Sequence, residues 1–224
     1  MTDNRQQPAL KVVLRDLNPK VVAAWRSAFA DNPEVDIAVG SILDQRVDAW
    51  VSPTNSRGAM DGGVDAAIKR HLGPGIQLRV QRAIRDQFAG WLPIGSAVCV
   101  RSGAKYPKFL ISTPTMEQSV QNVRWTLNVA LACAAAFQAI HMQNAWQPNS
   151  IRSVALVGMG AATGQVPAQV CANLMWAGYT LFQEYAFDSY DELRETVCAQ
   201  LEDIDKKPAT TRVRIAPPAV AKRS

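Results

Sequence analysis

The sequence predicts an α/β fold of three layers, in which helices cover both faces of a mixed, mostly parallel sheet of about six strands. Two observations support this fold. Short apolar runs alternate along the chain with longer stretches of helical period, and two of the short runs lead through a glycine-rich loop into a helix. Strands separated by helices form a mainly parallel sheet that is buried on both faces. The 224 residues, of which 48% are hydrophobic, are enough for one such core.

The N-terminal half supplies three of the expected strands and three helices. Pro19 suits the first turn of a helix because its φ is fixed, and Gly73-Pro74 is a helix stop signal. Trp25 and Phe29 lie on one helical face. We expect the strands at residues 11–17, 35–39 and 49–52, and the helices at 19–30, 63–72 and 76–88.

The C-terminal half continues the alternation. Val123, Leu127 and Leu131 belong to the apolar stripe of a long helix, and Pro167 opens another helix. The strands are expected at residues 95–101, 109–113 and 153–157, two helices at 167–183 and 190–204, and the apolar stripe of the long helix over residues 123–137. No internal repeat or linker divides these elements, so we expect a single domain over residues 1–205.

The basic character of the chain is concentrated in its last residues. The formal net charge is +5, but residues 206–224 contain six basic residues and no acidic one, which leaves 18 basic and 19 acidic residues elsewhere. With its prolines and no amphipathic period, this segment is expected to be a disordered tail. A basic tail can contact nucleic acid, although a solvated tail is the simpler interpretation.

Cysteine and histidine usage indicates neither disulfides nor a metal site. The four cysteines are widely spaced in apolar patterns, which is typical of reduced cysteines and predicts a cytoplasmic protein. Neither His71 nor His141 has a companion at metal-ligand spacing, so we expect no metal and no cofactor. The most apolar helical run, residues 129–140, is shorter than the roughly 20 residues of a membrane span, so we expect no membrane partner.

Two loops have the pattern of phosphate-binding loops. In the first, a strand is followed by a polar loop that ends in Gly62-Gly63 at a helix start; the second, VGMGAATGQVP, covers residues 157–167. Backbone N–H groups at a helix start have no intrahelical partner and can bind phosphate. The chain contains neither the G-x-x-x-x-G-K-[ST] of a P-loop nor an N-terminal G-x-G-x-x-G.

Asn55 and Asp65 flank the first glycine pair, and each has a structural and a functional interpretation. Asn55 follows Pro53 and suits a turn that its side chain stabilises by bonding its own loop. Asp65 lies in the first turn of a helix, where the dipole favours the ionised form, which serves equally for a helix cap and for a general base. Arg57 and Asp61 are typical of solvated loop charges.

The segment VDAWVSPTNSRGAMDGGVDAAI, residues 47–68, resembles the signature of macrodomains, the ADP-ribose-binding family. That signature has the form V-D-A-I-V-N-x-A-N, followed by a glycine run and V-D-x-A-I. The later GMGAATGQVP is similar to the family's second phosphate loop, and the order of motifs over residues 11–185 agrees. The G-x-M-D-G-G form resembles a bacterial subgroup.

The resemblance implies a role for several residues. Asn55 matches the asparagine that faces the distal ribose of ADP-ribose, and Asp65 matches the acidic residue that activates water in hydrolytic members. These two are the catalytic candidates. The implied ligand-binding residues are Ser41, Ile42, Asn55, Gly62, Gly63, Val64, Gly158, Met159, Gly160, Ala161, Thr163, Gly164, Gln165 and Val166.

Three positions depart from the family pattern. Ser41 replaces the aspartate that bonds the adenine amino group, so adenine recognition is weakened or rearranged. Val166 replaces an aromatic residue before Pro167. Ala161 and Ala162 stand where another branch of the family has an aspartate that works with a lysine adduct, which argues against that chemistry.

The resemblance implies two alternative functions. The first is hydrolysis of ADP-ribosyl esters, on acidic side chains of an ADP-ribosylated protein or in O-acetyl-ADP-ribose. The second is a binding module that reads ADP-ribose or a related nucleotide without turnover. The aspartate at position 65 favours the enzyme.

Overall fold

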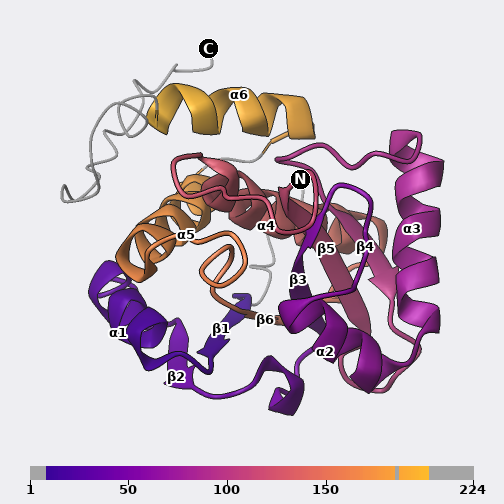
Figure 1. Ribbon diagram of the computed structural model, residues 1–224, viewed down its shortest axis with the longest axis horizontal. Helices are drawn as coiled ribbons and strands as arrows, with labels where there is room; N and C mark the ends of the chain where they lie inside the picture. The colour runs from indigo at the N-terminus through magenta and orange to yellow at the C-terminus, as the bar shows by residue number, and fades with distance from the viewer. Residues whose placement is uncertain (1–8, 185–186, 202–224) are drawn as a thin grey trace, which may run out of the picture.

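The computed structural model describes residues 9–184 and 187–201, and it shows a six-stranded sheet between layers of helices (Figure 1). The strand order is β2-β1-β6-β3-β5-β4, and every neighbouring pair is parallel except β4 and β5. The predicted fold class is therefore confirmed. The strands are β1 (Lys11–Asp16), β2 (Asp36–Val39), β3 (Ala49–Asn55), β4 (Val98–Arg101), β5 (Phe109–Met116) and β6 (Ser153–Leu156).

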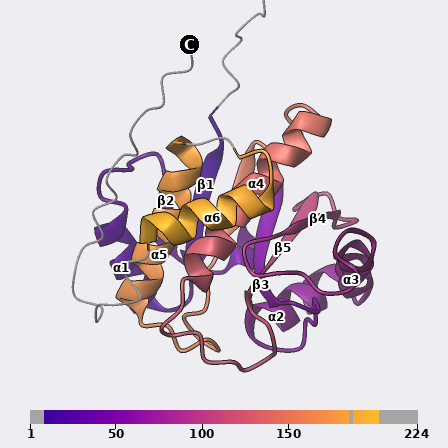
Figure 2. The same ribbon diagram turned by 90° about the horizontal axis from the view of Figure 1, so that it is seen from above.

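Helices bury both faces of the sheet, and alternate strand residues contact different helices. In β3, Ala49 and Val51 pack on one side and Trp50 packs on the other. The first side is covered by α1 (Pro19–Ala28), α4 (Asn128–Trp146) and α5 (Ala168–Glu184), and the second by α2 (Gly63–Leu72) and α3 (Gly75–Phe88). The last helix, α6 (Tyr190–Leu201), packs outside α4 (Figure 2). Within the described chain, no helix has the length and apolar character to cross a membrane.

Four element boundaries differ from the sequence prediction by three residues or more. Both β3 and β5 continue three residues further than expected, to Asn55 and Met116, because the residues at their ends still pair in the sheet. β4 begins at Val98 rather than residue 95. α4 begins at Asn128, because the buried Val123 lies in a loop and donates its N–H to the Gly164 carbonyl.

Two further segments bear on the sequence prediction, the C-terminal residues and a short turn after β2. Residues 202–204, expected to continue α6, and the tail at 206–224 lie outside the described residues. A short 3₁₀ turn, Ile42–Asp44, was not expected; Ser41 caps it by accepting a hydrogen bond from the Leu43 N–H at 3.1 Å.

The close packing of α4 on α5 depends on Gly178. A Cβ atom at this position would lie 2.5 Å from the Ala130 carbonyl oxygen and 3.1 Å from the Ala134 nitrogen. Both are backbone atoms of α4, which cannot move aside as a flexible side chain could. The small residue therefore sets how closely the two helices approach.

We expect Gly178→Ala to lower the free energy of unfolding by about 1–3 kcal/mol, the usual effect of overpacking a core. Helix propensity alone predicts the opposite sign, because alanine stabilises a helix interior relative to glycine. Gly75→Ala is the matched control, since a Cβ at Gly75 in α3 would have no neighbour within 4 Å. Urea unfolding measures both variants, and an unchanged or raised stability of Gly178→Ala would contradict the close approach.

Candidate functional site

A pocket lies where five strands of the sheet end. Because β1, β2, β3, β5 and β6 are parallel, their carboxyl ends lie at one edge of the sheet, where α/β proteins bind ligands. The residues that follow each of these strands line a pocket of about 540 Å³, which is in the usual range for small-molecule sites.

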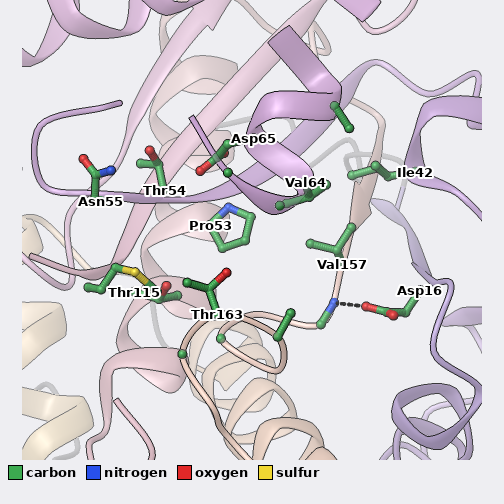
Figure 3. Close-up of a pocket in the computed structure, with 18 of the residues that line it drawn as sticks. Asp16, Ile42, Pro53, Thr54, Asn55, Val64, Asp65, Thr115, Val157 and Thr163 are labelled. Carbon is green, nitrogen blue, oxygen red and sulfur yellow. Dashed lines mark hydrogen bonds between the residues drawn. The ribbon is translucent and has the colours of Figure 1, made fainter. Parts of the chain in front are cut away.

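The pocket has two different ends and a middle section (Figure 3). Asn55 and Thr54 lie at one end, and Ile42 and Asp16 lie at the other. Between them, the start of α2 faces the loop that follows β6. A Cβ atom built on Gly63 would lie 3.8 Å from the Thr163 hydroxyl, so the two glycine loops meet across the pocket.

The Asn55 side chain holds its own loop together. Its Oδ1 accepts hydrogen bonds from the N–H groups of Arg57 at 3.0 Å and Ala59 at 3.2 Å. Its Nδ2 donates to the Ala59 carbonyl and to the Ser119 hydroxyl, each at 3.1 Å. These are the contacts that the turn interpretation predicts, and they place a buried carboxamide, 6% exposed, at the pocket wall.

Asp65 is buried, which changes the expectation for its charge. Its side chain is in the first turn of α2, but the residue is only 8% exposed, and the Ser52 hydroxyl donates a hydrogen bond to its Oδ1. Burial raises the pKa of the Asp65 carboxyl to about 6, although the bond from Ser52 lowers it. The helix dipole therefore does not dominate, and the carboxyl titrates close to neutral pH.

The start of α2 has unpartnered donors. Gly62 precedes the helix and provides no side-chain cap, and the N–H groups of Gly63 and Val64 have no hydrogen-bond partner in the described part of the chain. By contrast, Asn18 caps α1 through the Lys20 N–H. Uncapped N–H groups with the helix dipole behind them favour an anion.

The loop after β6 offers similar donors from the opposite side. Gly158 donates its N–H to the Asp16 carboxylate at 3.0 Å, the bond drawn in Figure 3. Further along, the N–H groups of Gly160, Thr163 and Gly164 have no partner among the residues that the structure describes. Gly160 has a φ of +70°, which few other residues adopt without strain.

The end of the pocket at Asp16 carries both charge signs, but its one basic group in the described lining is already paired. The Arg15 guanidinium bonds the Asp36 carboxylate at 2.8 Å and the Asp36 carbonyl at 2.8 Å. Asp16 accepts from Asn18 and Gly158, and Ser41 accepts from Leu43. Ser41 thus contributes to this wall as a turn cap.

Most of the residues expected to bind a ligand line the pocket together. Ten do so: Ser41, Ile42, Asn55, Gly62, Gly63, Val64, Gly158, Gly160, Thr163 and Gly164, with the catalytic candidate Asp65. Four do not: Met159, Ala161, Gln165 and Val166. Met159 and Val166 are 0% and 2% exposed because they pack in the core, and Gln165 accepts a side-chain bond from Asn122 outside the pocket.

Sequence reasoning missed two walls of the pocket. One follows β1 and comprises residues 15–17; the other ends β5 and continues beyond it, and includes Thr115, Met116, Ser119 and Val120. The available signal was the sheet itself, since every end of a parallel strand is a candidate wall. Asp61, which resembled a solvated loop charge, also lines the pocket while remaining exposed.

A model of the macro domain family matches residues 51–175, more than half of the chain. The chain belongs to the macrodomain family. Among curated proteins, an uncharacterised protein of Aquifex aeolicus is 34% identical over 148 residues, which cover 63% of this chain and 78% of that one. A macro domain-containing protein of Streptomyces griseus is 34% identical over 82 residues, 37% of this chain and 46% of that protein.

Solved macrodomains share the fold at low identity. The macrodomain of Mycobacterium tuberculosis DarG has a TM-score of 0.54 at 21% identity and covers 64% of this chain and 88% of its own. The Oceanobacillus iheyensis macrodomain has a TM-score of 0.52 at 18% identity and covers 74% and 90%. The family match of this macrodomain begins at residue 51, so the walls at residues 15–17 and 40–43 are built by chain outside it.

Asp65 should make the stability of this macrodomain fall as the pH rises. Its carboxyl has a pKa of 3.8 in a model peptide and about 6 in the fold, so the folded state binds the proton more tightly. The stabilisation of the fold by this proton is therefore fully present below pH 4. It is lost as the pH rises through about 6, and the loss is on the order of 3 kcal/mol of unfolding free energy.

The measurement is urea unfolding of wild type and Asp65→Asn at pH 4 and pH 7. The carboxamide that this substitution introduces cannot titrate, so the variant should gain stability relative to wild type at the higher pH. Asp86→Asn, which alters an exposed carboxylate on α3 that does not contribute to the raised pKa of Asp65, should show no such gain. A difference between wild type and Asp65→Asn that is constant with pH would contradict the assignment.

Proposed function

We propose that this macrodomain binds ADP-ribose in the pocket and hydrolyses ADP-ribosyl esters, on acidic protein side chains or in O-acetyl-ADP-ribose. One observation supports this most directly. The unpartnered N–H groups of Gly63, Val64, Gly160 and Thr163, counted within the described residues, lie midway along the pocket on two loops that face each other. ADP-ribose likewise carries its negative charge in the middle of the molecule, on a diphosphate between an adenosine and a terminal ribose.

The charge of the pocket supports recognition by backbone groups. Arg15 is the one basic residue in the described lining, and its guanidinium is held by Asp36. Neutral N–H groups at a helix start therefore replace lysine or arginine as the phosphate ligands. The terminal ribose would then lie toward Asn55 and the adenine toward Ile42.

The related structures support the same ligand and the same residues. The Oceanobacillus iheyensis macrodomain has been solved with ADP, and a variant of it with ADPR. Solved variants of that protein replace an asparagine, a glycine seven residues later and an aspartate ten residues later. Asn55, Gly62 and Asp65 have the same types and spacing in this chain.

Asp65 supplies the chemistry in this proposal. One carboxylate oxygen is held by Ser52, which leaves the second to accept a proton from water. With a pKa of about 6, the carboxyl is mainly ionised at pH 7 and remains basic enough to assist the attack of water on the ester. Water is the only co-reactant, and the products are the free acid and ADP-ribose.

A binding module without turnover is the second candidate, and the state of Asn55 and Asp65 favours it. The carboxamide of Asn55 is occupied by its own loop and Ser119, and Asp65 is 8% exposed. Both side chains therefore have clear structural roles. A protein that binds ADP-ribose without hydrolysing a substrate would need the same structural roles.

Binding is tested by calorimetry with ADP-ribose on the full chain. We expect measurable heat and at least about tenfold weaker binding of adenosine, because adenosine has no phosphate for the N–H groups of the two loops. The absence of heat with ADP-ribose would refute both candidates.

Turnover is tested on glutamate-ADP-ribosylated protein. Asp65→Asn should lower kcat by at least about 100-fold with KM little changed, because it removes the general base. The kcat of wild type should rise between pH 5 and 7 as Asp65, with its pKa of about 6, ionises.

Asp86→Asn is the control for turnover, because it alters an exposed carboxylate on α3 outside the pocket. It should leave kcat unchanged. Binding of ADP-ribose without turnover would rule out the enzyme and leave the binding module. Turnover that survives Asp65→Asn would rule out Asp65 as the general base.

A further inference from the structure

The end of the pocket at Asp16 combines apolar walls with a carboxylate. Ile42, Val157 and Asp16 lie at this end in Figure 3, and Leu17 and Leu43 line the pocket as their neighbours in the chain. Ile42 and Val157 are buried, whereas Leu17 is 74% exposed. An exposed leucine in a pocket wall is stabilised when an apolar part of a ligand covers it.

The Asp16 carboxylate is held in a fixed position. Asp16 ends β1, which lies outside the residues that the family model matches, so the family resemblance assigns it no role. Its Oδ1 accepts the Asn18 N–H at 2.8 Å, and its Oδ2 accepts the Gly158 N–H at 3.0 Å. A Cβ atom at Gly158 would lie 2.8 Å from Oδ2, so a larger residue there would displace the carboxylate. Bonds from two different loops therefore fix where its remaining lone pairs point.

The same carboxylate has acceptor capacity left for a ligand. An ionised carboxylate offers about four acceptor positions, and the described chain uses two of them on Asp16. Asp16 is only partly buried and lines the pocket, and the neighbouring Arg15 guanidinium is held by Asp36. The free positions therefore favour a neutral N–H or O–H donor of a ligand, and the negative charge disfavours a phosphate there.

We propose that Asp16 recognises the base of the bound nucleotide by accepting an N–H of its exocyclic amino group, while Leu17 and Ile42 contact the ring. This rests on the proposed binding of ADP-ribose. Of the donors in ADP-ribose, the amino group of adenine is the one attached to a flat ring, so it satisfies the carboxylate and the apolar walls together. The ribose hydroxyls are donors too, but they bring no comparable surface to cover Leu17.

The first test uses wild type and two ligands that differ by the amino group alone. In the analogue, purine replaces the adenine of ADP-ribose, so a hydrogen atom takes the place of the amino group while the ring, riboses and phosphates stay. We expect calorimetry to show that the analogue binds at least about tenfold more weakly, the effect of one lost hydrogen bond to a charged group. Equal affinities would overturn the inference.

Substitution of Asp16 should remove this preference. Asp16→Asn keeps the size of the side chain but replaces one acceptor oxygen with an NH₂ group. Asp16→Ser keeps a short acceptor that can still bond the Asn18 N–H, which makes it the second variant should the first fail to fold. Each should weaken ADP-ribose binding by roughly tenfold and bring the two affinities to within about twofold of each other. A variant that keeps the wild-type ratio would overturn the role of Asp16.

Two further variants serve as controls. Asp44→Asn removes an exposed carboxylate from the neighbouring 3₁₀ turn, outside the pocket lining, and should leave both affinities within about twofold. A preference lost in Asp44→Asn would indicate a general effect of negative charge and overturn the specific contact. Leu17→Ala should weaken both ligands by a similar factor of about three or more, because both contain the ring. Unchanged binding would overturn the ring contact.

The outcomes separate this inference from the proposed function. Wild type that does not bind ADP-ribose refutes the proposed function, and this inference with it. Wild type that binds ADP-ribose and its purine analogue equally overturns only the role of Asp16. Losses in the Asp16 variants that are equal for both ligands also overturn it, because they indicate a structural effect or a contact with a ribose hydroxyl.

Discussion

Beyond the carboxyl ends of the strands, backbone N–H and C=O groups no longer have hydrogen-bond partners on a neighbouring strand. The structure of the pocket depends on which other groups form hydrogen bonds with them. Buried backbone N–H and C=O groups almost always find a partner. Here four polar side chains supply it: Asp16 for Gly158, Ser41 for Leu43, Asn55 for its own turn, and Asn128 for the Thr115 carbonyl. The walls of the pocket are thus strand ends that have been capped from within the chain.

At the start of α2, and after Gly158 in the second glycine loop, several backbone N–H groups lack such a cap within the described chain. The start of α2 has no side-chain cap, whereas α1 is capped by Asn18. Several N–H groups of pocket-lining residues therefore have no partner within the described chain, and the described lining provides no free cation because Arg15 is paired with Asp36. A pocket of this kind attracts an anion through fixed dipoles, which need no reorganisation when the ligand arrives.

The sequence predicts the fold class and most of the pocket because both depend on local patterns. Alternating apolar periods define the layers, and the parallel sheet places Gly62 and Gly158 in the lining of one pocket. What it misses depends on tertiary contacts. Val123 looked helical because it is apolar, but it is buried against Gly164 from a loop. The burial of Asp65, which raises its pKa, depends on how α2 packs on β3 and cannot be read from a first-turn position.

The walls that were missed show why the pocket behaves as one unit. Asn55 is bonded to Ser119, the same loop is bonded through Val123 to Gly164, and Gly158 is bonded to Asp16 at the end of β1. These contacts form a continuous chain around the pocket from the first loop to the second and on to the far end. Since each link is already formed within the chain, little conformational entropy is left to lose on binding, which favours affinity.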